Sequence, residues 1–139
     1  MTSTDSDRYG YWTGAIWADA GGVRLRLGCG VGAVEFLAGR GRAVIAVLRA
    51  RNSLSPVLAL PGRPVRWVFL TAPDDPGVAV NNVTMVGARL RMTAPDVLTL
   101  PPSVTAHGPA RWIVSPGVGT CTPPWLQAVL SAAWQTMAV

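Results

Sequence analysis

The chain contains no lysine, although 12 of its 139 residues are basic, so every basic side chain is an arginine. Acidic residues are also few, and seven of them against 12 arginines leave a formal net charge of +5. The arginine fork suits phosphate and carboxylate recognition, whereas a bias toward GC-rich codons would give the same composition without any function. Without a following lysine, Gly28, Gly30 and Gly32 predict a tight turn and not a Walker-type phosphate loop.

Cysteine and histidine are scarce, with two cysteines and one histidine in the sequence. Cys29, His107 and Cys121 form no Cys-x-x-Cys motif and only weakly indicate a zinc site. Ser103 and His107 could form a nucleophile pair, but the absence of a nucleophile elbow favours a solvated turn histidine. We therefore expect no metal and no cofactor, and the distant thiols predict reduced cysteines in a cytoplasmic protein.

Long apolar runs are missing as well. The longest helix-like run, Ala43–Leu48, is too short to cross a membrane, and the polar start Met1–Asp7 is not a signal peptide. Apolar residues still make up 50% of the chain, which predicts one domain with its own core. We expect a flexible tail over residues 1–8, a single domain over residues 9–139, and no membrane partner.

Short apolar segments separated by 15 glycines and 12 prolines favour strands over a helix bundle. Strands are predicted at residues 23–27, 33–37, 56–60, 65–70, 83–92, 96–100 and 111–114. The connection between 56–60 and 65–70 is too short for a parallel crossover, so these two should pair antiparallel. Apolar stripes predict one helix around 38–52 and a C-terminal helix around 123–137. The predicted fold class is α+β, with a mixed or antiparallel sheet.

The most constrained stretch lies between the predicted strands 96–100 and 111–114. Pro101 and Pro102 block a helix and fix the backbone, and Gly108 permits a conformation that most residues avoid. We expect the two strands to form a hairpin-like unit with a polar tip.

The same stretch resembles a known family. Its proline-proline-serine motif, a glycine five residues later and a tryptophan four residues after that match the primase/polymerase domain of bifunctional DNA primase-polymerases. The matching residues are Pro101, Pro102, Ser103, Gly108 and Trp112. The resemblance covers roughly residues 23–125. It implies membership of the archaeo-eukaryotic primase superfamily, which includes short actinobacterial forms.

The residues that this resemblance implies for catalysis are largely missing. Active members place two acids, one residue apart, on the strand that binds the divalent metal, and here that strand offers only Glu35. Arg66 and Trp67 occupy the place of an expected histidine, and Thr105 stands where a histidine often follows the serine. We predict a degenerate pseudo-enzyme that binds no metal. The vestigial candidates are Glu35, Asp96 and His107.

Two predicted strands, 23–27 and 83–92, each carry a pair of arginines on one side. If these strands are neighbours, four guanidinium groups share one sheet face and could contact phosphates, while Trp67 or Trp112 stacks on a base. A solvated face with scattered acids is the plain alternative. The predicted nucleic-acid contacts are Arg24, Arg26, Arg89, Arg91, Arg111 and Trp112.

These observations predict a non-catalytic primase/polymerase-like domain that binds nucleic acid or a replication or repair partner. A protein-interaction module or homodimer, built on surplus tryptophans and the C-terminal helix, is the first alternative. A residual metal-dependent nucleotidyl-transfer enzyme is the second, and it requires Glu35 and Asp96 to meet in space. The salt dependence of binding distinguishes the nucleic-acid-binding domain from the protein-interaction module, because binding to phosphates weakens steeply as the salt concentration rises.

Overall fold

The computed structural model describes residues 16–19, 22–26, 31–72, 89–90, 97–101, 103–116 and 126–137. Within them the chain forms an α+β fold of antiparallel strands and two helices, which confirms the predicted fold class. The predicted tail over residues 1–8 and most of the predicted strand 83–92 lie outside the described residues.

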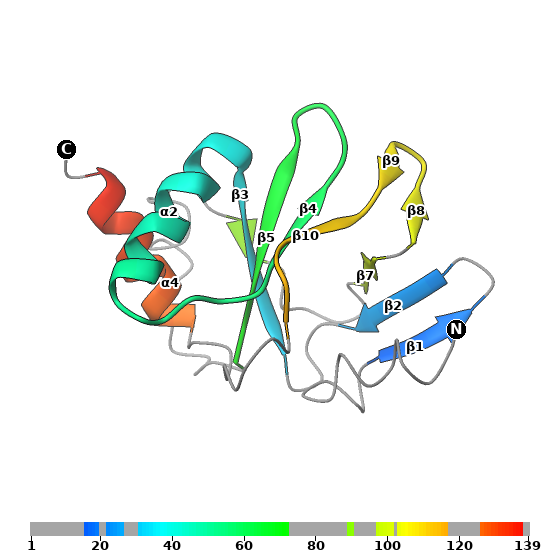
Figure 1. Cartoon of the computed structure of the whole chain (residues 1–139), viewed down its shortest axis with the longest axis horizontal. Helices are drawn as coiled ribbons and strands as arrows, with labels where there is room; N and C mark the ends of the chain where they lie inside the picture. Colours follow the sequence, from blue (N-terminus) through cyan, green and yellow to red (C-terminus); the bar gives the residue numbers. More distant parts are fainter. Residues whose placement is uncertain are drawn as a thin grey trace.

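The central layer is an antiparallel sheet of five strands in the order β10-β4-β5-β3-β6 (Figure 1). Its strands are β3 (Gly32–Leu37), β4 (Val57–Leu60), β5 (Arg66–Thr71), β6 (Arg89–Leu90) and β10 (Arg111–Val114). Strands β4 and β5 pair antiparallel as predicted, with Ala59 opposite Trp67. β3 and β5 are almost entirely buried, because layers cover both faces of the sheet.

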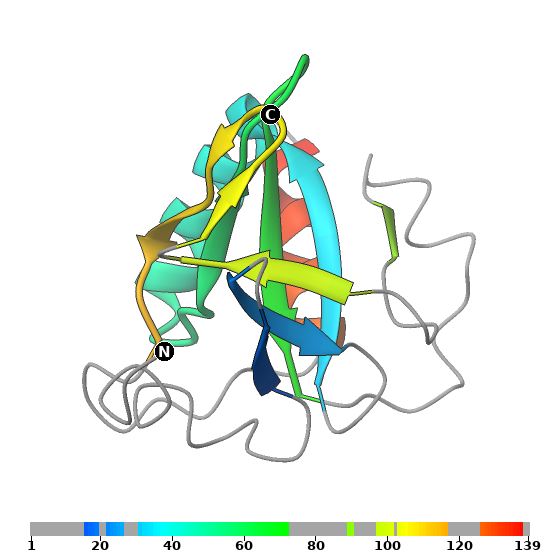
Figure 2. The same cartoon turned by 90° about the vertical axis from the view of Figure 1, so that its right-hand side faces the viewer.

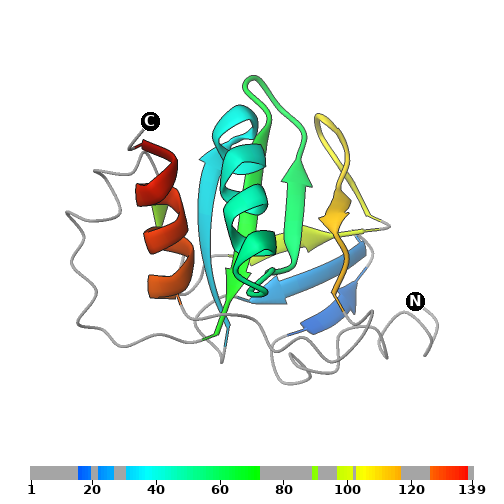
Figure 3. The same ribbon diagram turned by 60° about the vertical axis from the view of Figure 1, so that its left-hand side comes forward.

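Two helices, α2 (Ala38–Ala50) and α4 (Leu126–Met137), lie side by side against one face of this sheet (Figures 1 and 3). The predicted apolar stripes form this interface, and Val44 and Leu48 of α2 and Val129 of α4 are fully buried. The predicted end of the first helix is confirmed. Asn52 adopts a left-handed φ of 58°, and the N–H of Ser53 donates to the Leu48 carbonyl at 2.9 Å.

A second, smaller sheet covers the opposite face of the central sheet (Figure 2). It consists of β1 (Ile16–Asp19), β2 (Gly22–Arg26) and β7 (Val97–Leu100), in the order β1-β2-β7. β2 alternates as predicted, since Val23 and Leu25 are buried between the sheets. The described strands therefore form three layers: helices, the five-stranded sheet and the three-stranded sheet.

The hairpin predicted from residues 96–100 and 111–114 is wrong. β7 pairs with β2 in the smaller sheet, whereas β10 pairs with β4 in the central sheet. Between them lies a short ribbon of β8 (Val104–Thr105) and β9 (Gly108–Pro109). The chain passes from the smaller sheet to the central sheet through this ribbon. β7 belongs to the smaller sheet because its Leu98 and Leu100 are buried in the core between the two sheets. Gly108 has the expected positive φ, at 130°.

Candidate functional site

Ser103, the serine of the proline-proline-serine motif, ties the turn after β7 to the start of β2 within the smaller sheet. Its side chain is buried, and its Oγ accepts a hydrogen bond from the backbone N–H of Val23 at 2.7 Å. Gly22 has a φ of 120°, and a Cβ on it would lie 2.1 Å from this hydroxyl oxygen. The serine thus occupies space that only a glycine at position 22 leaves open. Of the neighbouring prolines, Pro101 is half-buried and Pro102 lies outside the described residues.

His107 is exposed in the turn between β8 and β9. Its backbone N–H donates to Thr105 Oγ1 at 3.2 Å, and that hydroxyl donates to the Gly108 carbonyl at 2.8 Å. Ser103 is bonded elsewhere, and the interactions of the described residues include none between it and His107. The structure does not bring the proposed nucleophile pair together.

Glu35, the candidate acid of β3, is buried and lies next to Arg66 of β5. A guanidinium nitrogen of Arg66 donates to Glu35 Oε2 at 3.2 Å, and the side chains are 42% and 5% exposed respectively. The strand register explains the contact: Glu35 is opposite Val68, so Arg66 lies two residues away on the same face. The buried charge is therefore compensated by an arginine at the place where the family resemblance predicted a histidine.

The remaining candidate residues are only partly described. β3 lies between β5 and β6, and backbone register places Arg89 of β6 directly opposite Glu35. Asp96, the second candidate acid, lies outside the described residues, as do Cys29 and Cys121. The described part of the chain contains no group of three or more His, Cys, Asp or Glu side chains that could hold a metal ion.

The four strand arginines do not share a sheet face, because their strands are not neighbours. β2, with Arg24 and Arg26, belongs to the smaller sheet, and β6, with Arg89, is the edge of the central sheet. Arg91 lies outside the described residues. The sequence of β2 alone predicts which of its residues share a face. It does not predict that β2 pairs with β7, because these two strands are distant in the sequence.

Arg24 and Arg26 do lie together on the outer face of the smaller sheet, which we call the outer face below. Arg24 donates to Thr99 Oγ1 of β7 at 2.6 Å and is half-buried, and Arg26 is exposed. Backbone register places Trp17 of β1 opposite Arg24, and Val97 of β7 opposite Arg26. Two arginines and a hydroxyl thus occur on neighbouring strands of one face, and the backbone of Trp17 lies on the third strand. Figure 2 shows these three strands.

The two tryptophans proposed to stack on bases are structural. Trp67 is only 8% exposed and packs under α2, with the guanidinium of Arg42 5.9 Å from its ring centroid. A Cβ on Gly41 would lie 2.9 Å from this ring, so the glycine permits the close contact. Trp112 is half-buried and packs against the core between the two sheets, opposite Leu58. This role for Gly41 was not predicted.

Arg111 also lies apart from the outer face. It is opposite Ala59, whose side chain belongs to the core under the helices, so Arg111 is on the helix side of the central sheet. Two arginines of α2 and the residue that caps its end make internal contacts instead: Arg40 and Arg51 with α4, and Arg42 with Trp67.

The C-terminal helix exposes two large apolar side chains, with Trp134 at 55% and Met137 at 48%. Met137 was predicted to be part of the buried stripe, and its exposure contradicts that assignment. Neither α2 nor α4 has the length and apolar character that a membrane-spanning helix requires.

No family model, no curated protein and no solved structure matches the chain. The resemblance to primase-polymerases thus stays a prediction that rests on the motif residues.

Proposed function

We propose that the chain is a non-catalytic, primase/polymerase-like domain that binds single-stranded nucleic acid across the outer face. The observation that carries the proposal is the placement of Arg24 and Arg26 on one side of β2, beside Thr99. Two guanidinium groups along a strand can follow successive phosphates.

The distribution of the other arginines supports this choice of surface. Arg40 and Arg51 hold α2 to α4, and Arg66 compensates Glu35. These three side chains have structural roles in the fold, so the high arginine content alone does not indicate a phosphate-binding surface. Arg24 and Arg26 also have interactions within the chain, so the choice of the outer face rests on their placement on one side of β2.

The contact between Glu35 and Arg66 supports the absence of catalysis. A two-metal nucleotidyl transfer needs carboxylates free to hold cations. Glu35 is buried, and its carboxylate accepts a hydrogen bond from a guanidinium. Templated nucleotide incorporation by the purified chain, lost in a Glu35→Gln variant, would overturn this part of the proposal.

Fluorescence anisotropy with a labelled single-stranded oligonucleotide tests the binding surface. An Arg24→Gln/Arg26→Gln double variant should bind about tenfold or more weakly at low salt, because two phosphate contacts are lost. The slope of log affinity against log salt should fall by about 1.4, at ~0.7 per phosphate contact on a single strand.

An Arg49→Gln/Arg63→Gln double variant is the matched control, since it removes the same charge from two exposed arginines on other elements. It should retain most of the affinity. Equal losses of affinity in both variants would show that binding depends on net charge and not on the outer face. No binding of DNA or RNA at low salt would reject the proposed function.

A second candidate function is protein association through α4. Trp134 and Met137 are exposed and three residues apart, so they lie on one side of the helix. Sedimentation over a concentration series should then show association that is insensitive to salt and lost in Trp134→Ala. A monomer at all concentrations would exclude self-association.

A further inference from the structure

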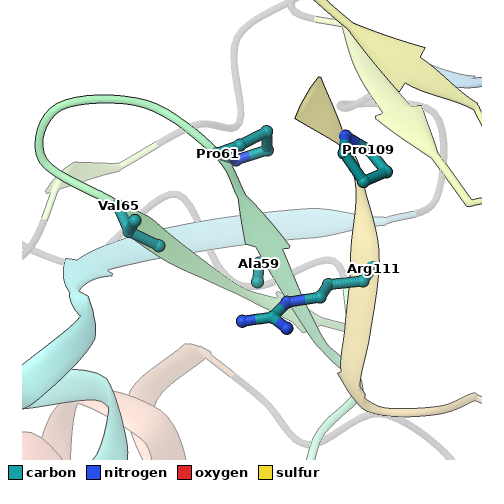
Figure 4. Close-up of a pocket in the computed structure, with 5 residues that line it drawn as sticks. All are labelled: Ala59, Pro61, Val65, Pro109 and Arg111. Carbon is teal, nitrogen blue, oxygen red and sulfur yellow. The ribbon is translucent and has the colours of Figure 1, made fainter. Parts of the chain in front are cut away.

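Arg111 lines a pocket on the helix side of the central sheet, away from the outer face. The pocket has a volume of about 260 Å³ and is lined by Ala59, Pro61, Val65, Pro109 and Arg111 (Figure 4). The Arg111 side chain extends from β10 across Ala59 of the neighbouring strand. The pocket thus combines one cationic side chain with four apolar ones.

Backbone geometry builds this pocket. Ala59 forms a small floor between two larger cross-strand neighbours, Trp67 on β5 and Arg111 on β10. The walls are the loop after β4, which carries Pro61, and the ribbon strand β9, which carries Pro109. These two walls approach each other at Gly108, where a Cβ would lie 3.7 Å from Pro61 Cβ.

The charge of Arg111 is not compensated by the described residues. Arg111 is exposed, and its side chain has no hydrogen bond, ion pair or ring contact with any described residue. Arg66, in contrast, donates to the carboxylate of Glu35. A guanidinium beside an apolar surface recognises an oxyanion that carries an apolar body.

The lining distinguishes between the two common oxyanions. Phosphate usually binds where several donors converge, such as a helix N-terminus or successive backbone N–H groups. Here the side chains provide a single guanidinium, and Pro61 and Pro109 have no backbone N–H to donate. One positive charge in an apolar setting matches a monoanion, and a carboxylate pairs with it through two parallel hydrogen bonds.

We propose that this pocket binds a monocarboxylate whose apolar body is about the size of one amino-acid side chain. A small free acid and the C-terminal carboxylate of a peptide with an apolar last residue share this chemistry. The inference does not rest on the proposed nucleic-acid function, because Arg111 and the outer face lie on opposite sides of the central sheet.

Titration of the full chain, followed by NMR chemical shifts, tests the pocket with five probes. The probes are 4-methylpentanoate, its amide, inorganic phosphate, and an acetylated tripeptide ending in valine with a free or an amidated C-terminus. The acid should bind with a dissociation constant of about 1 mM, as expected for a ligand of this size. The amides and phosphate should bind at least about tenfold more weakly. A tighter complex with the free-ended peptide than with the small acid would identify a peptide terminus as the source.

Two variants assign the binding to the pocket. Arg111→Gln should weaken carboxylate binding about tenfold or more, and Arg111→Lys should lose less because one charge-assisted hydrogen bond remains. Arg49→Gln, on the exposed side of α2, is the matched control and should bind as the parent chain does. Val65→Phe should weaken binding by filling the pocket.

Equal affinity for acid and amide, unchanged binding in Arg111→Gln, or tighter binding of phosphate than of carboxylate would each overturn the assignment. So would the absence of any shift at acid concentrations of about ten times the expected constant. Thermal unfolding should show that Arg111→Gln is as stable as the parent, since Arg111 is exposed. If that variant unfolds, Arg111→Lys and Val65→Phe carry the test.

Discussion

On the helix side of the central sheet, Trp67, Phe69 and Phe36 pack under α2 and α4, and the rings of Phe36 and Phe69 meet edge to face with centroids 5.4 Å apart. On the other side, apolar residues of β2 and β7 also form a core, but buried polar groups accompany them. Glu35 pairs with Arg66 there, and Ser103 holds the start of β2. On the helix side the described directional bonds run from Arg40 and Arg51 to α4, whereas on the other side they involve the sheet strands themselves.

The difference explains why the motif stretch is so polar. The chain leaves the smaller sheet at this stretch, and the buried Ser103 hydroxyl fixes it there by bonding the backbone N–H at the start of β2. Helices packed by their side chains obtain the same precision from close contact, as at Gly41 and Trp67. The polarity of residues 101–110 therefore does not by itself indicate catalysis.

Trp67→Ala should have the largest effect, because it empties the centre of the helix interface. Replacing a buried tryptophan by alanine costs about 3–5 kcal/mol in the free energy of unfolding. Urea denaturation of the two proteins measures the difference. Trp134→Ala is the control and should change stability by less than about 0.5 kcal/mol, since Trp134 is 55% exposed. Similar losses in both would contradict the assigned interface.

Ser103→Ala tests whether the smaller sheet depends on the hydrogen bond from the Val23 N–H to Ser103 Oγ. The substitution leaves the buried Val23 N–H without a partner, which costs about 1–3 kcal/mol. Ser115→Ala is the control, because Ser115 is exposed and bonds only to the carbonyl of its neighbour Pro116. A loss in Ser103→Ala no larger than in Ser115→Ala would show that apolar burial alone holds the smaller sheet.

Arg66→Met removes the cation beside Glu35 while keeping most of its apolar length. Loss of this ion pair should destabilise the chain by about 1–2 kcal/mol, moderated by the partial exposure of Arg66 and by the other interaction of Glu35. Adding Glu35→Gln should restore part of this loss, and a double-mutant cycle by urea denaturation measures the coupling. Strictly additive effects would mean that the pair contributes no coupling energy.

Much of the fold could be predicted from local patterns. The helix at 38–50 followed from its apolar stripe, and the β4–β5 pair followed from a connection too short for a crossover. The partition into two sheets could not be predicted, since it depends on the pairing of β2 with β7 across a long sequence separation. The expected hairpin of β7 with β10 failed for that reason.

In the candidate site, too, the local features could be predicted and the long-range ones could not. Alternation correctly placed Arg24 and Arg26 on one side of β2, but no local signal showed that β6 joins a different sheet. The partner of Glu35 could have been anticipated. A single acid in an apolar strand requires a compensating group, and Arg66 was the cation on the adjacent predicted strand.

Arg51→Gln should have the smallest effect, although Arg51 hydrogen-bonds both Ser131 and Gln135 across the helix pair. These bonds are exposed, and water replaces them at little cost, so the loss should be below about 1 kcal/mol. Urea denaturation beside Arg49→Gln provides the comparison, because Arg49 lies in the last turn of α2 and its side chain bonds no described residue. If Arg51→Gln lowered the free energy of unfolding more than Ser103→Ala does, the helix side would depend on polar bonds more than the smaller sheet does. That result would contradict the difference between the two faces.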